Sequence, residues 1–244
     1  MKHGRLDRYT PRIEKLGAAV ILILTMLFMI YLTASAFLQT TDISIADPSG
    51  EYAEIYSDNI FLNLIFVFIF LAALYIFYRH GMEIKLRRLE IALLCWTFIL
   101  GAAFIASVKL RAPWYSDSFY VTYAAQRAAV GDYSALENYF VRFPFQLGYV
   151  LYSEIFFRVA GTLIPGLPDG YYCLALQGVN LLWLLLCYHA LIRISLYIYS
   201  SMRIQKLTAL LLFFCFPAVL SCTFLYGNIP AFSCGTVAVW MFLA

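Results

Sequence analysis

The sequence contains little charge. Only 13% of its 244 residues are Asp, Glu, Lys or Arg, whereas 63% are hydrophobic and the mean hydropathy is +0.79. A soluble domain usually carries about a quarter of charged residues. The composition therefore excludes a soluble globular protein and indicates that lipid surrounds much of the chain.

Motifs for several common chemistries are also missing. The six cysteines form no CxxC pair and lie in or beside apolar runs, which is typical of small residues that fill helix interfaces. No spacing of His, Cys and Asp indicates zinc, and no glycine-rich strand–helix motif indicates a soluble nucleotide. The sequence also lacks an internal repeat and a basic patch for nucleic acid. We therefore expect no nucleic-acid partner, no protein-bound metal and no cofactor.

Long apolar runs, in contrast, recur along the chain, and a helix needs about 20 apolar residues to cross the hydrocarbon layer. The runs long enough to span are residues 16–38, 60–78, 91–108, 171–192 and 207–225. The first exceeds the apolar core of a signal peptide and predicts an uncleaved span. A sixth run begins near Ala231 and extends to Ala244, which is too short to cross the bilayer as a helix. We predict an all-α, polytopic transmembrane helical bundle and expect the chain to be the N-terminal portion of a longer protein.

The Lys and Arg residues of the short loops predict the orientation. Residues 1–15 carry five Lys or Arg, whereas residues 39–59 carry acidic side chains only, and residues 79–90 are basic again. We therefore predict a multi-pass protein of the cell membrane with a cytoplasmic basic tail over 1–15. The next segment, 16–88, holds two transmembrane helices. The third span then delivers the chain from residue 109 onward to the outer face.

Residues 147–164 are apolar enough to suggest a further span, but Glu154 and Arg158 lie in the middle, one helical turn apart. A charge at mid-bilayer depth costs about 2.5–3.5 kcal/mol. A crossing here would also move the later basic residues to the outer side (Arg193, Arg203 and Lys206). We therefore predict a juxtamembrane or re-entrant helix on the outer face, with a crossing segment as the open alternative.

The outer segment 109–146 is the longest polar stretch, and long ordered loops often carry function. Pro113 ends the preceding helix, Ser116 fits an N-cap, and Asp117 falls in the first turn of an Ala-rich helix that ends before Gly131. The positive end of that helix favours an ionised carboxylate. Asp117 is therefore the candidate general base, with plain helix capping as the alternative.

An ordered set of short motifs follows from this point. The set consists of Pro-Trp-Tyr-Ser-Asp at 113–117, Gly-Asp-Tyr at 131–133, Phe-Pro-Phe-Gln-Leu-Gly at 143–148, Phe-Phe-Arg-Val-Ala-Gly at 156–161 and Tyr-Gly-Asn at 226–228. Over residues 89–230 this order resembles the first outer loop of bacterial GT-C-type membrane glycosyltransferases, the mannosyltransferase-like class that uses polyprenyl-phosphate sugars. The match departs from that class at Asn228, where an acid is common. The chain also differs from that class in its two N-terminal spans. Proteins of the class usually have about twice as many spans as this chain.

The resemblance implies an inverting transferase that moves a sugar on the outer face from a lipid-linked donor to a hydroxyl of a glycan, lipid or protein. Residues 89–244 would form its transmembrane core, with the catalytic-type loop over 109–170 and Asp117 as the base. Some transferases of this class use a divalent cation and many do not, so a cation stays open.

The residue types fit that chemistry. Arginine can bind a phosphate through two parallel hydrogen bonds. The candidate ligands of the donor phosphate are Arg127, Arg142 and Arg158. Arg142 as a snorkelling interface residue is the alternative. Aromatic faces and polar groups for a sugar complete the candidate set: Trp114, Tyr120, Tyr139, Gln146, Glu154, Tyr226 and Asn228. For Trp114 the interfacial aromatic belt is the alternative.

Other polar residues have simpler interpretations. We expect Asp132 to be a solvated loop charge, His189 to be a hydrogen-bonded packing residue, and Gln177 and Asn180 to join helices. The basic tail also suits contact with anionic membrane lipids. Two other functions stay open. One is a transporter or flippase component in which Glu154 and Arg158 line a path, and the other is a non-catalytic membrane fragment.

Overall fold

A computed structural model describes residues 6–43, 53–80, 83–107, 117–137, 139–166 and 169–244. The chain divides into two compact units, residues 1–72 and 73–244, which are described separately. Trp114, Pro113 and the expected N-cap Ser116 lie outside the described residues.

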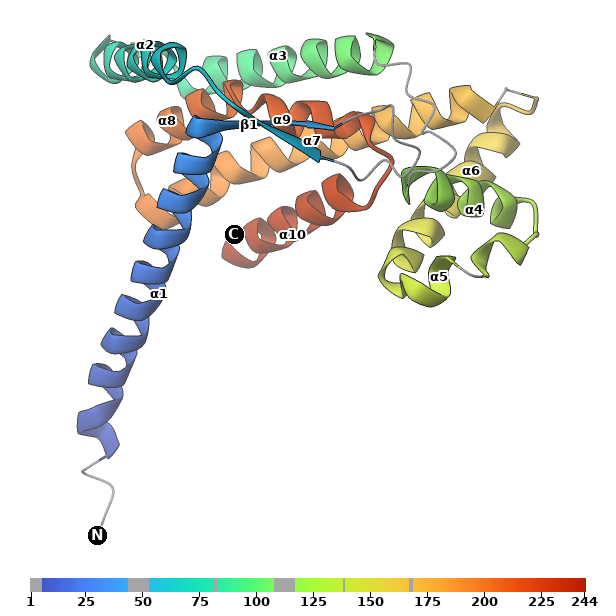
Figure 1. The fold of residues 1–244 in the computed structure, drawn as a ribbon, viewed down its shortest axis with the longest axis horizontal. Coiled ribbons are helices and arrows are strands. Elements are labelled where there is room, and N and C mark those ends of the chain that lie inside the picture. The colour runs from blue at the N-terminus through green and yellow to red at the C-terminus, as the bar shows by residue number, and fades with distance from the viewer. Residues whose placement is uncertain (1–5, 44–52, 81–82, 108–116, 138, 167–168) are drawn as a thin grey trace. The chain divides into compact units, whose positions relative to one another are not determined.

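The first unit contains one long apolar helix, a small hairpin and the first part of a second apolar helix (Figure 1). Helix α1 spans Leu6–Leu38, strands β1 (Gln39–Ile43) and β2 (Ala53–Ser57) pair antiparallel, and α2 begins at Ile60 and ends at His80 in the second unit. The hairpin was not predicted. Asn59 caps α2, because its Oδ1 accepts hydrogen bonds from the backbone amides of the next turn. No residue of α2 is buried, as expected for a helix surrounded by lipid.

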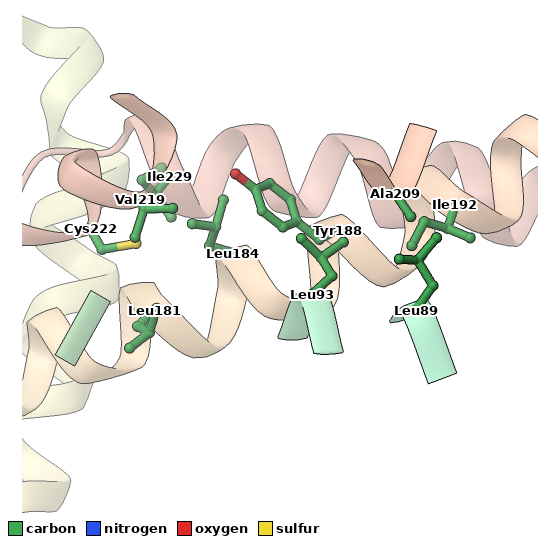
Figure 2. Close-up of a cluster of buried hydrophobic side chains, with 10 residues drawn as sticks. All are labelled: Leu89, Leu93, Leu181, Leu184, Tyr188, Ile192, Ala209, Val219, Cys222 and Ile229. Carbon is green, nitrogen blue, oxygen red and sulfur yellow. The ribbon is translucent and has the colours of Figure 1, made fainter. Parts of the chain in front are cut away.

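The second unit is built around α7 (Asp169–Tyr199), which lies between α3 (Leu86–Ser107) and α10 (Asn228–Leu243) in Figure 1. One buried cluster joins these helices to α8 (Met202–Phe213) and the following turn. Figure 2 shows its members: Leu89, Leu93, Leu181, Leu184, Tyr188, Ile192, Ala209, Val219, Cys222 and Ile229. The apolar stripes of α3 and α7 thus bury against each other, while their other faces keep exposed apolar side chains.

The fifth predicted span, 207–225, is a helix pair with a break. Helix α8 ends at Phe213, and α9 (Phe216–Leu220) with the 3-10 turn η4 (Ser221–Thr223) continues at an angle of 58°. Pro217 explains the break, because proline has no N–H to donate and its ring clashes with the carbonyl four residues earlier, that of Phe213. The prediction of one continuous helix was therefore wrong in detail.

Buried amides of α7 bind backbone carbonyls at the end of the bent pair, where η4 stops. Gln177 Nε2 donates to the carbonyl of Thr223 at 2.7 Å, and Asn180 Nδ2 donates to that of Phe224 at 3.2 Å. Irregular backbone at membrane depth is tolerated where protein groups supply its hydrogen bonds. The prediction that Gln177 and Asn180 join helices is confirmed.

A helical subdomain holds most of the candidate residues. It contains α4 (Asp117–Ala129), η2 (Ser134–Leu136), α5 (Tyr139–Arg142), η3 (Pro144–Gln146) and α6 (Leu147–Leu163). Its buried cluster includes Val121, Phe140, Val150, Phe157 and Leu176 of α7. Packing of α6 on both α4 and α7 therefore fixes the start of α4 relative to the bundle.

The structure confirms the helical, multi-span architecture. Four described helices are long and apolar enough to cross a membrane, and the number is five when the bent pair is counted as one span. These segments are 19–38, 60–80, 86–107 and 170–199, with 202–223 as the bent pair. Helix α6 is not among them, and α10 is a shorter apolar helix, in agreement with the predicted count.

Candidate functional site

Asp117 is the first residue of α4, and its side chain is exposed. The position follows from the sequence, since a carboxylate is favoured at the positive end of a helix. Ser118, the next residue, donates its hydroxyl to the carbonyl of Leu225 at 3.2 Å. This bond holds the start of α4 against the segment that follows η4, although the two lie more than 100 residues apart in sequence.

Two tyrosines lie around the Asp117 carboxylate, and a glutamine lies beside one of them. Tyr226 donates its hydroxyl to Asp117 Oδ2 at 3.4 Å. Tyr139 lies close enough to Asp117 and Tyr226 for both to affect its hydroxyl. Its oxygen is shielded from solvent and has no hydrogen-bond partner of regular geometry among the described residues. Gln146 is buried and lies beside the Tyr226 hydroxyl. Four of the predicted residues are thus brought together.

The two tyrosine hydroxyls are donors at neutral pH. Burial raises the pKa of Tyr139 far above its usual range, and the neighbouring Asp117 and Tyr226 raise it further. Burial, followed by the negative charge of Asp117, also raises the pKa of Tyr226. Because both groups keep their protons, they can orient the carboxylate and donate to an incoming polar ligand.

Aromatic rings extend from this group along α4 and α5. Tyr120 stacks on Tyr139, with ring centroids 4.9 Å apart and an interplanar angle of 11°. The ring of Phe143 is tilted relative to that of Tyr139, and the two centroids are 4.9 Å apart. We call Tyr120, Tyr139 and Phe143 the aromatic wall. Tyr120 and Phe143 are about 40% exposed, so the wall presents flat apolar rings beside an exposed carboxylate.

Arg127 is occupied within its own loop. Its guanidinium pairs with Asp132, which also accepts hydrogen bonds from the hydroxyl of Ser134 at 2.7 Å and from its backbone amide at 3.0 Å. The bonds from Ser134 and then Arg127 lower the pKa of Asp132 to about 2. Asp132 was expected to be only solvated; instead it organises the end of α4, and Arg127 is neutralised there.

Arg158 is also held by protein groups. Its Nη2 donates to the carbonyl of Ala128 at 2.8 Å and to the hydroxyl of Tyr133 at 3.1 Å, and its Nε donates to Glu154 Oε1 at 2.9 Å. The hydrogen bond that Arg158 donates to Glu154 raises the pKa of the Arg158 guanidinium. The predicted Glu154–Arg158 pair is therefore present, and it caps the last turn of α4, where a cation is favoured.

Arg142 differs from the other two candidate arginines. It is exposed, and among the described residues no carboxylate forms an ion pair with it. It shares the four-residue helix α5 with Tyr139, three positions earlier, so the two lie on one side of the helix. Asn228, also exposed, begins α10 two residues after Tyr226.

One set of buried polar residues lies outside the predicted site. Glu90 of α3 is 5% exposed and contacts both His189 and Arg193 of α7. His189 is thus hydrogen-bonded, as predicted. Glu90 received no interpretation from the sequence, although a carboxylate one residue before an apolar run is a signal that could have been followed.

In chemical terms, the predicted residues offer one exposed carboxylate, two protonated tyrosines, a buried amide and aromatic rings. They also offer the exposed guanidinium of Arg142, which forms no ion pair within the part of the chain that the structure describes. Among the described residues, no group of three or more His, Cys, Asp or Glu could hold a metal ion. Comparisons with protein-family models, with curated protein sequences and with solved structures find no match for this chain.

Proposed function

We propose that the chain is a membrane glycosyltransferase that moves a sugar from a polyprenyl-phosphate donor to an acceptor hydroxyl on the outer face of the membrane. The observation that carries this proposal is the exposed Asp117 carboxylate, oriented by Tyr226 at 3.4 Å and placed beside the aromatic wall. Sugar recognition combines ring faces with a few directed polar groups, and this surface supplies both. The resemblance to GT-C-type transferases points to the same chemistry.

The proposed reaction is a single inverting displacement. Oδ1 of Asp117, the carboxylate oxygen that Tyr226 leaves available, takes the proton of the acceptor hydroxyl. The acceptor oxygen forms a bond to the anomeric carbon while the bond from that carbon to the phosphate oxygen breaks, and its electron pair stays on the polyprenyl phosphate. The proton on Asp117 is then released to water. A positioned base of this kind contributes about 10²–10⁴-fold to rate.

The leaving phosphate needs a cation, and the described geometry favours Arg142. Arg127 and Arg158 already neutralise Asp132 and Glu154, so recruiting either would leave a carboxylate without its partner. Arg142 lies on the helix that carries Tyr139, beside the aromatic wall. We assign the phosphate contact to Arg142, and assign Arg127 and Arg158 to the support of α4.

The proposal includes the orientation derived from the loop charges, with the N-terminus in the cytoplasm and α4 outside. The length of α6 and the attachment of Arg158 to Ala128 support a helix that does not cross. Single cysteines at Leu163 and Tyr199, both exposed, test this with a membrane-impermeant thiol reagent. Labelling of position 163 from outside and position 199 from inside fits the proposal, and the reverse favours the transporter alternative.

The test of activity is Asp117→Asn, compared with Asp132→Asn in the same loop. Transfer of labelled hexose from a polyprenyl-phosphate donor into membrane glycans is measured for both variants at equal expression. We expect Asp117→Asn to lower the rate by at least about 100-fold, while Asp132→Asn retains most of it because Asp132 supports structure only. Equal rates for wild type and Asp117→Asn would remove Asp117 as the base.

A further inference from the structure

Residues 223–226 lead from the end of η4 to the loop before α10, and we call them the tether. Each of these four residues makes a hydrogen bond to a distant part of the second unit. The carbonyls of Thr223 and Phe224 accept from the side-chain amides of α7 at 2.7 Å and 3.2 Å. Both donors are buried, since Gln177 is 2% exposed and Asn180 is 0% exposed. The first half of the tether is therefore fixed to the central helix of the bundle.

The second half of the tether bonds to the start of α4. The carbonyl of Leu225 accepts from the hydroxyl of Ser118 at 3.2 Å, and the hydroxyl of Tyr226 donates to Asp117 Oδ2 at 3.4 Å. Leu225 is 4% exposed and lies in the same buried cluster as Val121 of α4. Two neighbouring residues of α4 thus bind two neighbouring residues of the tether, although 107 and 109 positions separate the bonded pairs.

The two bonds to α4 differ in how firmly they hold. The bond from Tyr226 to Asp117 is exposed, and its 3.4 Å is long for two oxygens, which are usually about 2.7–2.8 Å apart. The bond from Ser118 is partly buried and ends on the backbone of the tether. Because it joins the backbone beside Asp117 to the backbone beside Tyr226, it limits how far these two side chains can separate.

We propose that Ser118 is a positioning residue, whose bond to the tether keeps Asp117 beside Tyr226 in the orientation that proton transfer requires. Its hydroxyl is bound to the Leu225 carbonyl, so Ser118 acts through Asp117 and not on the substrate. The role in catalysis rests on the proposed transferase function, whereas the link between α4 and the tether does not. Through this link, the packing of the broken helix on α7 sets the geometry at the candidate base.

The next turn of α4 provides a matched control. The hydroxyl of Thr122 donates to the carbonyls of Ser118 and Phe119 at 2.7 Å and 3.1 Å, so both bonds stay within its own helix. Thr122→Val removes these bonds at nearly constant shape, whereas Ser118→Ala removes the bond to the tether. Ser118→Thr keeps a hydroxyl at position 118. These three variants separate loss of the tether from a general weakening of α4.

Hydrogen exchange of the full chain in lipid nanodiscs tests the link without any assay of activity. Ser118→Ala should speed exchange about 2–10-fold in residues 117–122 and also in residues 225–229, because one hydrogen bond between these segments is lost. Thr122→Val should affect only the first of these segments. Unchanged exchange over 225–229 in Ser118→Ala would overturn the link, whatever the activity of the protein.

Steady-state kinetics of hexose transfer from a polyprenyl-phosphate donor tests the role in catalysis. We expect Ser118→Ala to lower kcat by about 10–100-fold, since a misplacement of about 1 Å can cost about 100-fold. The KM for the donor should stay within about twofold, because Ser118 does not bind it. Ser118→Thr should recover most of the lost kcat, and Thr122→Val should keep it. An equal loss in Ser118→Ala and Thr122→Val would show a structural role only.

A double-mutant cycle then asks whether Ser118 acts through the contact of Tyr226 with Asp117. Tyr226→Phe should also lower kcat, and adding Ser118→Ala to it should cause no further loss, because the contact is already absent. Losses that multiply in the double variant would overturn the proposal. If the wild-type chain transfers no sugar, the proposed function and the catalytic role of Ser118 both fail, while the exchange experiment still decides the link to the tether.

Discussion

Replacing Gly101 with alanine tests how closely α3 and α7 pack. A Cβ at position 101 would lie 2.5 Å from Cδ1 and 3.0 Å from Cδ2 of Leu181, whereas carbon atoms attract each other best at about 3.5–4.0 Å. Leu181 is 3% exposed and belongs to the buried cluster of Figure 2, so it has little room to move. Overpacking of this kind costs about 1–3 kcal/mol.

Gly178 of α7 is the matched control, because a Cβ there meets no atom within 4 Å. Both glycines lie inside helices, so the gain in helix propensity from glycine to alanine, about 1 kcal/mol, applies to each and cancels in the comparison. We therefore expect Gly101→Ala to have a free energy of unfolding about 1–3 kcal/mol lower than that of Gly178→Ala.

The assay is reversible unfolding of the chain in mixed micelles by a denaturing detergent, followed by far-UV circular dichroism. The same pair is then measured in a Leu181→Ala background, where the clashing methyl groups are absent. There the two alanine variants should agree within about 0.5 kcal/mol, because the coupling of Gly101 to Leu181 is gone. Equal free energies of unfolding for Gly101→Ala and Gly178→Ala with Leu181 present would refute this account of the α3–α7 contact.

Three further predictions concern polar groups that support the fold. Gln177→Ala should lower the free energy of unfolding by about 1–3 kcal/mol, since the buried carbonyl of Thr223 loses its 2.7 Å donor; an unchanged value in the same titration would contradict this. Arg158→Gln should speed hydrogen exchange at the end of α4, because the Ala128 carbonyl loses its donor, and equal exchange would show that α4 does not need the cap. The pKa of Asp132 is lowered to about 2 from an ordinary 3.8, so its contribution to folding is complete above about pH 4 and is lost as the pH falls through 2. A carboxyl ¹³C titration should have its midpoint near 2, and a midpoint near 4 would exclude the bonds from Ser134.

The spans could be predicted from the sequence because each depends on a contiguous apolar run. Their ends were less accurate: α3 begins at Leu86 rather than at residue 91, since the helix continues through charged residues that a hydropathy argument excludes. The break after Phe213 had a local signal in Pro217, which was not used. The pairing of β1 with β2 was not predicted.

The site was predictable to the extent that its contacts are local. The Glu154–Arg158 pair follows from a spacing of four on one helix, and the structure contains it. The bond from Tyr226 to Asp117 joins residues 109 positions apart. No periodicity in a single sequence connects such residues, because their meeting depends on how α6 and the broken helix pack.

The structure therefore changes which arginine the proposed chemistry can use. From sequence alone Arg127, Arg142 and Arg158 were all candidate phosphate ligands, with membrane snorkelling as the alternative for Arg142. Arg127 and Arg158 are in fact already bound to carboxylates at the end of α4. Breaking an ion pair to bind a phosphate gains little, since one charge contact replaces another and a carboxylate is left facing the ligand. An exposed arginine on the helix of Tyr139 has no such penalty. Arg142 and Asp117 are thus the two charged residues on which the proposed transferase depends. We expect Arg142→Gln to impair use of the donor while leaving α4 intact.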